Sequence, residues 1–437
     1  MNDYSSFTGG AVTAATKEDD SLVVTFRRML LEEVDLHELS KIDANQRRAR
    51  LERVIAHLVS REGVILSASE RNQLVRRVVD EAVGLGVLEP ILNDPSVSEI
   101  MINGHDTIYV ERAGKLERWP APFSSDEQLM QTIDRIVSTV NRRVDESSPM
   151  VDARLPADSR MPRGARVNVV LPPLSLNGPT VTIRLFPHAL SLTQLIERES
   201  IDRRTALLLK ACVEGRLNVV VSGGTGSGKT TLLNALSSFI NPDERIVTIE
   251  DAAELSLNQP HTIRLETRPA NVEGRGQVSI RDLVRNSLRM RPDRIIVGEC
   301  RGGEALDMLQ AMNTGHEGSL TTVHANNPDD ALSRLETLAS MSDGAVPFHA
   351  LRDQVNSAID IIVQLNRLAD GSRRVVDVSW VRSRRQEEFD LVPLMQYAID
   401  RTDPAKPQGR FDVYDLPAPL RQRLTEGGAD LSLVEVA

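Results

Sequence analysis

A glycine-rich loop between an apolar strand and an apolar helix constrains this chain more than any other feature of its sequence. Residues 223–230 are Gly-Gly-Thr-Gly-Ser-Gly-Lys-Thr, which fits the phosphate-loop pattern G-x-x-x-x-G-K-[ST]. The apolar run Asn218–Val221 precedes the loop, and the apolar helical pattern 231–239 follows it. Glycines let backbone N–H groups converge on phosphate oxygens, and a helix N-terminus adds a favourable dipole. The loop therefore predicts an α/β domain that binds a nucleoside triphosphate.

Consecutive residues of this loop are predicted to bind the nucleotide. They are Gly223, Gly224, Thr225, Gly226, Ser227, Gly228, Lys229, Thr230 and Thr231. We expect the ammonium group of Lys229 to reach the β- and γ-phosphates of ATP and the hydroxyl of Thr230 to ligate Mg²⁺. The alternative is a glycine-rich turn that contains a lysine by chance. It is disfavoured because a strand precedes the loop and a helix follows it.

Acidic side chains follow two further apolar runs of this region. Residues 294–299 are Arg-Ile-Ile-Val-Gly-Glu, the layout of a Walker-B strand, and Glu250-Asp251 follows the run Ile246–Ile249. The carboxyl ends of parallel strands meet at one edge of a sheet, so both sets of carboxylates should lie near the phosphate loop. Glu299 is the candidate to polarise the attacking water or to hold Mg²⁺ through water. Its alternative is an exposed glutamate at a strand end. Glu250 is predicted to point at the same edge.

A histidine also stands at this predicted edge. His324 follows the apolar run Leu320–Val323, and His316 precedes that run. A single histidine is more often a structural residue than a catalytic one. Because three polar strand-end positions converge on one edge, we predict that His324 senses the phosphate.

The composition narrows the class of protein. A chain of 437 residues with 41% hydrophobic and 26% charged residues indicates two or three globular domains. A net charge of −10 and an aromatic content of 3% disfavour direct binding to nucleic acid. No apolar run approaches the length of about 18 residues that a membrane span needs, and the N-terminus lacks a secretory signal. We expect a cytoplasmic protein.

Hydrophobic spacing divides the chain into segments. The predicted segments are a flexible leader (1–45), a small helical module (46–92), an α+β domain (93–190), a linker (191–202), an α/β domain (203–385) and a polar C-terminal tail (386–437). In the α+β domain the predicted strands are 100–102, 108–110, 167–171 and 181–186. In the α/β domain they are 218–221, 246–249, 295–297, 320–323 and 361–365. Near-continuous apolar strands separated by helices predict a parallel sheet covered by helices on both faces.

Four sequence boxes, taken in order, resemble those of the secretion ATPases of type II and type IV systems and their relatives in pilus assembly. They resemble that family's Walker A, Asp, Walker B and His boxes. The matching residues are 223–231, 248–254, 295–299, and 314–316 with 322–325. The resemblance covers residues from about 90 to about 380 and implies that the α/β domain is RecA-like.

Within that superfamily the chain is most similar to the tight-adherence (Flp) pilus assembly branch. The stretches that carry this similarity are 234–237, 264–269, 273–276 and 305–315. Type II export and pilin-extension members usually contain a four-cysteine zinc module. This chain has two cysteines, Cys212 and Cys300, which favours the tight-adherence and type IV branches. An aliphatic residue is expected where Cys300 stands, and a small buried residue is favoured there over a redox-sensitive thiol.

The resemblance implies a subunit with two domains in a homohexameric ring, in which ATP hydrolysis swings one domain against the other. It implies an inner-membrane platform protein as partner, with membrane association only through partners, and pilin polymerisation or export as the work done. In relatives, arginines of the N-terminal domain reach the γ-phosphate. Arg154, Arg166 and Arg184 stand at the matching positions, and Arg160 is a rival to Arg166. Surface ion pairs are the alternative for each of these arginines.

Other functions stay open on the sequence alone. RecA-like ATPases include helicases and DNA translocases, which the acidic charge and the few aromatic residues disfavour. A conjugation-type secretion ATPase, which itself touches no DNA, is a further alternative. A scaffold that binds ATP without turnover is disfavoured by the lysine, threonine and strand-end glutamate.

Overall fold

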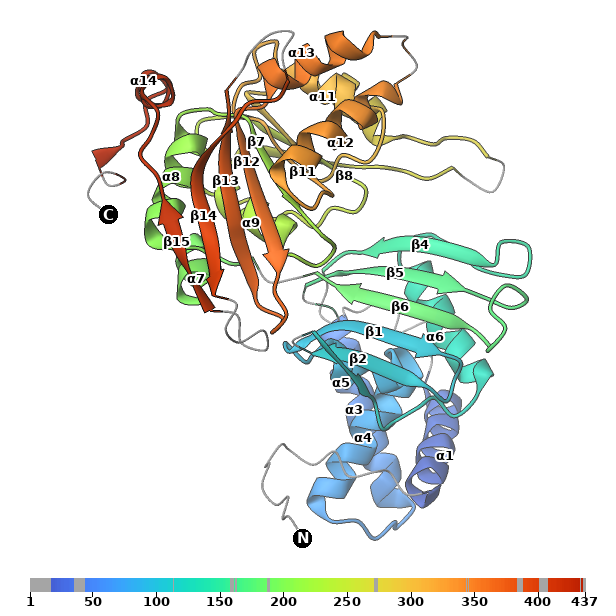
Figure 1. Cartoon of the computed structure of the whole chain (residues 1–437). Coiled ribbons are helices and arrows are strands. Elements are labelled where there is room, and N and C mark those ends of the chain that lie inside the picture. Colours follow the sequence, from blue (N-terminus) through green and yellow to red (C-terminus); the bar gives the residue numbers. More distant parts are fainter. Residues whose placement is uncertain are drawn as a thin grey trace. The chain divides into compact units, whose positions relative to one another are not determined.

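The computed structural model describes residues 17–34, 44–112, 114–157, 161, 163–186, 189–270, 274–342, 344, 346–382, 388–400, 408–432 and 434. The chain divides into two compact units, Met1–Pro187 and His188–Ala437 (Figure 1). The segment 191–202, predicted as a linker, therefore lies inside the second unit.

Three helices form a small bundle in the first unit. They are α1 (Lys17–Glu33), α3 (Ala44–Arg61) and α4 (Ala68–Val83), and each contacts the other two. Their apolar side chains form a core of their own. The prediction of a flexible leader over residues 1–45 is wrong for α1, because Val23 and Phe26 are each 1% exposed in this core. Acidic and basic residues around this short apolar stripe conceal its helical spacing in the sequence.

An antiparallel sheet and one helix form the rest of the first unit. The strand order is β3-β2-β1-β6-β5-β4, and every neighbouring pair is antiparallel. The strands are β1 (Val97–Asn103), β2 (Ile108–Arg112), β3 (Lys115–Arg118), β4 (Met150–Leu155), β5 (Ala165–Val170) and β6 (Thr180–Leu185). Buried residues of α6 (Asp126–Ser138) share one core with the sheet and with two short helical turns, η1 (Gly86–Leu88) and α5 (Glu89–Leu92). The sequence predicted four of these strands but not β3 or β4, whose residues are more polar.

A mixed sheet forms the centre of the second unit. Its strand order is β15-β14-β13-β12-β7-β11-β10-β8-β9. The six neighbouring strands β12, β7, β11, β10, β8 and β9 are parallel to one another. Strands β13, β14 and β15 extend the sheet beyond β12 as antiparallel strands. The strands are β7 (Val219–Gly223), β8 (Ile246–Glu250), β9 (Thr262–Glu266), β10 (Arg294–Val297), β11 (Leu320–Val323), β12 (Ile361–Arg367), β13 (Arg373–Val381), β14 (Leu391–Asp400) and β15 (Gln408–Val413).

Helices cover both faces of this sheet, which explains why its central strands are almost entirely buried and mostly apolar (Figure 1). The helices of one face are α7 (Leu192–Glu197), α8 (Arg203–Glu214), α9 (Lys229–Ser237) and α14 (Ala418–Glu426). Those of the other face are α10 (Ile280–Ser287), α11 (Glu304–Met312), α12 (Pro328–Ser340) and α13 (Phe348–Ala358). Among the described helices, none combines the length and the apolar character that a membrane span requires.

Two sequence predictions for the second unit are corrected by the structure. The predicted linker contains α7, whose Leu192 and Leu195 are buried in the core of the parallel sheet. The predicted tail contributes β14, β15 and α14, and Arg423 of α14 forms an ion pair with the buried carboxylate of Asp360. Both segments are polar on their outer side, so only a few apolar residues in each mark the buried face.

Candidate functional site

The glycine-rich loop joins β7 to α9 at the edge of the sheet where the parallel strands end. Gly226 and Gly228 have φ angles of +70° and +99°, which favour glycine, and Gly228 begins α9 without a side-chain cap. A Cβ atom on Gly223 would lie 2.4 Å from the carbonyl oxygen of Leu365, whereas one on Gly224 would meet no atom within 4 Å. The loop thus packs against β12 on one side and is open on another. An uncapped helix N-terminus beside an open loop favours an anion.

Lys229 lies within this loop and is 8% exposed. Its Nζ donates hydrogen bonds to the carbonyl oxygens of Gly223 and Gly224, both at 2.9 Å. The same Nζ lies 3.5 Å from Nδ1 of His324, at the end of β11. The ammonium group is therefore held between the phosphate loop and the histidine that the sequence placed at this edge.

Side chains from the ends of β8, β10 and β11 form one continuous chain of contacts that reaches Lys229. Nη1 of Arg301 lies 3.3 Å from a carboxylate oxygen of Asp251, and its Nε donates to Oε2 of Glu299 at 2.7 Å. Nε2 of His324 lies 2.7 Å from Oε1 of Glu299. We call Asp251, Arg301, Glu299, His324 and Lys229 the edge chain. Oε2 of Glu299 is hydrogen-bonded in this chain, whereas Oε1 lies close to His324 but has no hydrogen bond among the described residues.

His324 is the uncharged link of the edge chain. Partial burial lowers the pKa of its imidazole, and the positive charges of Lys229 and Arg301 lower it further, while Glu299 acts in the opposite direction. The ring is therefore neutral at neutral pH. In the neutral tautomer that carries its proton on Nε2, Nδ1 is the acceptor that faces Lys229.

Glu250 lies at this edge but outside the edge chain. Its Oε2 accepts hydrogen bonds from the backbone amides of Glu254 at 2.9 Å and Leu255 at 3.0 Å. Burial raises the pKa of this carboxyl group to about 7. A Cβ atom on Gly298 would lie 2.8 Å from Cγ of Glu250, so the glycine before Glu299 leaves room for this side chain. Of the pair Glu250-Asp251, it is Asp251 that contacts Arg301.

Sequence reasoning missed Arg301 and found its neighbour Glu299. The pairing of Arg301 with Asp251 depends on the sheet order, which places β8 beside β10. Cys300, between the two charged residues, is 2% exposed and its Sγ lies 3.3 Å from Sδ of Met308. Burial raises the pKa of this thiol to about 12, which confirms the prediction of a small buried residue rather than a reactive thiol.

Buried polar atoms without a partner among the described residues gather around the loop. They include the hydroxyls of Ser222 and Ser227, and Oε1 of each of Glu250, Glu299 and Gln364. An unsatisfied buried polar group costs about 1–3 kcal/mol, which is tolerated where a ligand alters the local contacts. Together with the open space at Gly224, these atoms fit a nucleotide site.

The same edge fits Mg²⁺ when the ion is shared with a nucleotide. Among the described residues no group of three or more His, Cys, Asp or Glu side chains is arranged to hold a metal. Magnesium usually takes one or two side chains together with phosphate oxygens and water. Thr230 lies in the first turn of α9, and Glu299 follows two residues after the end of β10.

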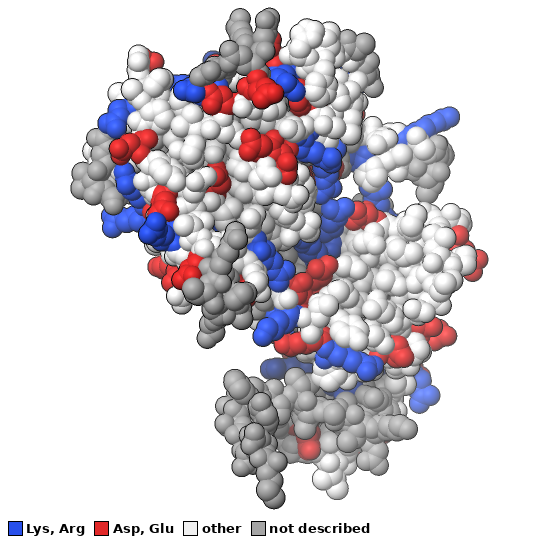
Figure 2. Space-filling view, viewed as in Figure 1, with Lys and Arg blue, Asp and Glu red and all other residues white. Residues whose placement is uncertain are grey.

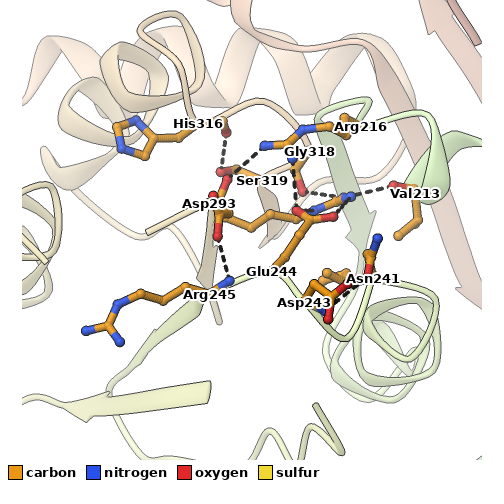
Figure 3. A network of polar contacts seen from close by, with 12 residues as sticks. Val213, Arg216, Asn241, Asp243, Glu244, Arg245, Asp293, His316, Gly318 and Ser319 are labelled. Carbon is orange, nitrogen blue, oxygen red and sulfur yellow. Dashed lines mark hydrogen bonds and ion pairs between the residues drawn. The ribbon is translucent and has the colours of Figure 1, made fainter. Parts of the chain in front are cut away.

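A second charged network lies at the opposite edge of the sheet, where the strands begin (Figure 3). Arg294, the first residue of β10, is 1% exposed, and its Nε and Nη2 donate to the two carboxylate oxygens of Glu244 at 2.7 and 2.9 Å. Its Nη1 donates to the carbonyl oxygens of Val213 at 2.8 Å and Gly318 at 3.2 Å. The carbonyl oxygen of His316 accepts from a serine hydroxyl in this network. His316 thus lies at the other end of β11 from His324.

In the first unit, the three predicted arginines form a row. Arg154 of β4 lies directly opposite Arg166 of β5, which lies directly opposite Arg184 of β6. Arg166 forms an ion pair with Asp152 at 2.5 Å. Arg184 lies directly opposite Glu99 of β1, so carboxylates flank this row of like charges. Arg160 lies outside the described residues.

Comparisons with known proteins bear on the site as a whole. The model of the family "Type II/IV secretion system protein" matches residues 81–425. A putative conjugal transfer protein of Mycobacterium tuberculosis is 39% identical over 309 residues, which are 70% of this chain and 87% of that protein. The conjugal transfer protein TrbB of Rhizobium radiobacter is 33% identical over 313 residues, 71% of this chain and 91% of that protein. The type IV secretion system protein PtlH of Bordetella pertussis is 35% identical over 328 residues, 68% of this chain and 94% of that protein.

A solved structure shares the fold. The pilus retraction motor PilT with bound ADP is 19% identical, with a TM-score of 0.53 over 78% of this chain and 87% of that chain. The two-unit α/β architecture, with an antiparallel sheet before a RecA-like sheet, is thus that of a known fold.

Proposed function

Because this chain belongs to the type II/IV secretion system family of ATP hydrolases, we propose that it is the ATP-driven motor of a type IV, conjugation-like secretion machine. The observation that carries the proposal is the edge chain, which runs from Asp251 to Lys229 beside the phosphate loop. Relatives that cover most of this chain have conjugal transfer and type IV secretion in their names.

In this proposal the loop and Lys229 bind the phosphates of ATP. The amides at the start of α9 face an anion without competition from a side-chain cap. Lys229 leaves the carbonyl oxygens of Gly223 and Gly224 for the phosphates, which are stronger partners for an ammonium group. Mg²⁺, held by Thr230 and by Glu299 through water, would neutralise phosphate charge.

Glu299 is the proposed general base for the attacking water. Its Oε2 accepts a hydrogen bond from Arg301, and that contact must open before this oxygen accepts a proton. Arg301 is the group that can release it, because Arg301 also contacts Asp251 and keeps a carboxylate partner afterwards. His324, whose Nε2 lies 2.7 Å from the second oxygen, would keep that oxygen oriented.

We further propose that the arginine row of the first unit, Arg154, Arg166 and Arg184, stabilises charge on the γ-phosphate. The support is the register that sets these like charges side by side. Glu250 is kept as a candidate for shaping the same edge. The protein would act as a homohexamer on the cytoplasmic side of the inner membrane, bound to a platform protein there.

A motor that acts on nucleic acid directly is disfavoured. The net charge is −10, and on the face in Figure 2 basic side chains are interspersed with acidic ones over the second unit. A second candidate function is pilus assembly of the tight-adherence kind. The stretches 234–237, 264–269 and 305–315 favour it. The two candidates share the chemistry at the edge chain and differ in the cargo that the machine moves.

The proposal is tested with the purified chain. We expect it to release phosphate from ATP only with Mg²⁺ and to form six-fold particles by electron microscopy. A chain that stays monomeric at every nucleotide state and concentration would rule out the ring. Deletion of the gene separates the two candidates: loss of pilin export supports pilus assembly, and loss of conjugal transfer with pilin export intact supports the conjugation-like machine.

A further inference from the structure

Arg373, the first residue of β13, contacts the phosphate loop from an element that the sequence did not predict. Its Nε donates to the carbonyl oxygen of Gly226 at 2.8 Å. A Cβ atom on Gly228 would lie 3.5 Å from Cδ of Arg373, so the side chain follows the loop over several residues. The turn after β12 brings it there, since Leu365 of β12 pairs in register with Gly223.

The next residue, Arg374, has different contacts. Its Nη2 lies 3.2 Å from a carboxylate oxygen of Glu199, and its guanidinium lies over the ring of Tyr397 at 5.3 Å. Successive side chains of a strand point to opposite faces, which separates the two arginines. Within the described residues no carboxylate pairs with Arg373, and its side chain is exposed.

The charge balance at this edge indicates what Arg373 contributes to phosphate binding. In the edge chain, Lys229 and Arg301 are matched by Glu299 and Asp251. A loop that binds a triphosphate needs more positive than negative charge, and Arg373 supplies it at the loop itself. Its hydrogen bond also fixes the peptide after Gly226, whose glycine would otherwise allow that peptide to rotate.

We propose that Arg373 is a positioning residue of the nucleotide site: it holds the phosphate loop in its binding geometry and adds the positive charge that favours the phosphates of ATP and ADP. This inference rests on the proposed ATPase function. Through Arg373, nucleotide binding at the loop would be coupled to β13, the strand that begins the antiparallel extension of the sheet.

The test compares Arg373→Ala, Arg373→Lys and Arg374→Ala in the full chain. We measure the Kd of a fluorescent ADP analogue, together with KM and kcat for ATP and the melting temperature. Because Arg373→Ala removes a hydrogen bond donated by a charged group, we expect it to raise Kd and KM about tenfold, with a smaller effect on kcat. Arg373→Lys should restore most of the affinity. Arg374→Ala should leave Kd unchanged even if it lowers the melting temperature.

Two results would overturn the inference. One is a wild-type Kd in Arg373→Ala. The other is an equal loss of affinity in Arg374→Ala, because both losses would then be explained by a disturbance of β13. If Arg373→Ala does not fold, Arg373→Gln takes its place with the same expected rise in Kd. A wild-type chain that binds no ADP analogue would contradict the proposed function instead. A wild-type chain that binds it no better than Arg373→Ala contradicts only the role of Arg373.

Discussion

The two edges of the parallel sheet carry charged networks of opposite character. At the edge where the strands begin, Arg294 is 1% exposed, and the half-buried carboxylate of Glu244 and two backbone carbonyls accept its hydrogen bonds. At the edge where the strands end, His324 and Arg301 have side chains that are 42% and 54% exposed, and buried polar atoms nearby have no partner among the described residues.

The difference separates a structural network from a functional one. Arg294 is buried and all its guanidinium nitrogens are hydrogen-bonded, so its value is to fix the strand ends of the fold. The edge chain lies beside an open loop, and its exposed groups Arg301 and His324 can change partners. Charged residues alone would not distinguish the two edges, because both contain arginine–glutamate pairs and both have exposed members. The buried polar atoms without a partner beside the phosphate loop do distinguish them.

The largest change in activity is expected from a substitution at the edge where the strands end. Lys229→Ala should lower kcat by roughly 10³-fold, because it removes the cation aimed at the transferred phosphate, and it should leave the melting temperature near that of the wild type. Lys210→Ala, on α8 of the same unit, is the matched control and should retain full turnover. Phosphate release and thermal unfolding measure the two properties. Full activity in Lys229→Ala would contradict the assignment of catalysis to the edge where the strands end.

The opposite edge should respond in stability instead. Arg294→Met leaves the half-buried carboxylate of Glu244 without its main partner and should cost about 3–5 kcal/mol of unfolding free energy. The double variant with Glu244→Leu should recover part of that loss, because it removes the unpaired charge. Chemical denaturation measures both. Turnover per folded molecule should stay close to that of the wild type, and a specific loss of kcat would show that this network reaches the active edge.

A smaller effect is expected on how the stability of the fold depends on pH, through Glu250 at the edge where the strands end. Its pKa is raised to about 7 from 4.5, so it stabilises the folded protein below about pH 4.5, and that contribution is lost as the pH rises through about 7. Glu250→Gln mimics the protonated form. Relative to this variant, the wild type should lose on the order of 3 kcal/mol of unfolding free energy between about pH 4.5 and pH 8. A difference that stays constant with pH would contradict the burial of an ionisable carboxyl group here.

The sequence predicts the active edge better than it predicts the rest of the molecule. The central strands β7, β8, β10, β11 and β12 are buried on both faces and mostly apolar, so their positions and the polar residues at their ends are visible as patterns. Strands β13 to β15 are half exposed, and β14 contains Pro393, so their alternation is weak. The contacts of Arg301 and Arg373 require the order of the strands in space, which no local pattern contains.

If catalysis takes place at the edge where the strands end, Glu299 and Glu244 differ in what they contribute. Single-turnover ATP cleavage is compared in Glu299→Gln and Glu244→Gln at a temperature where both variants are folded. We expect a loss on the order of 10²-fold in Glu299→Gln, with nucleotide still bound and the melting temperature unchanged. We expect near wild-type cleavage in Glu244→Gln, with a lowered melting temperature. Robust cleavage by Glu299→Gln, or an equal loss in folded Glu244→Gln, would contradict catalysis at that edge.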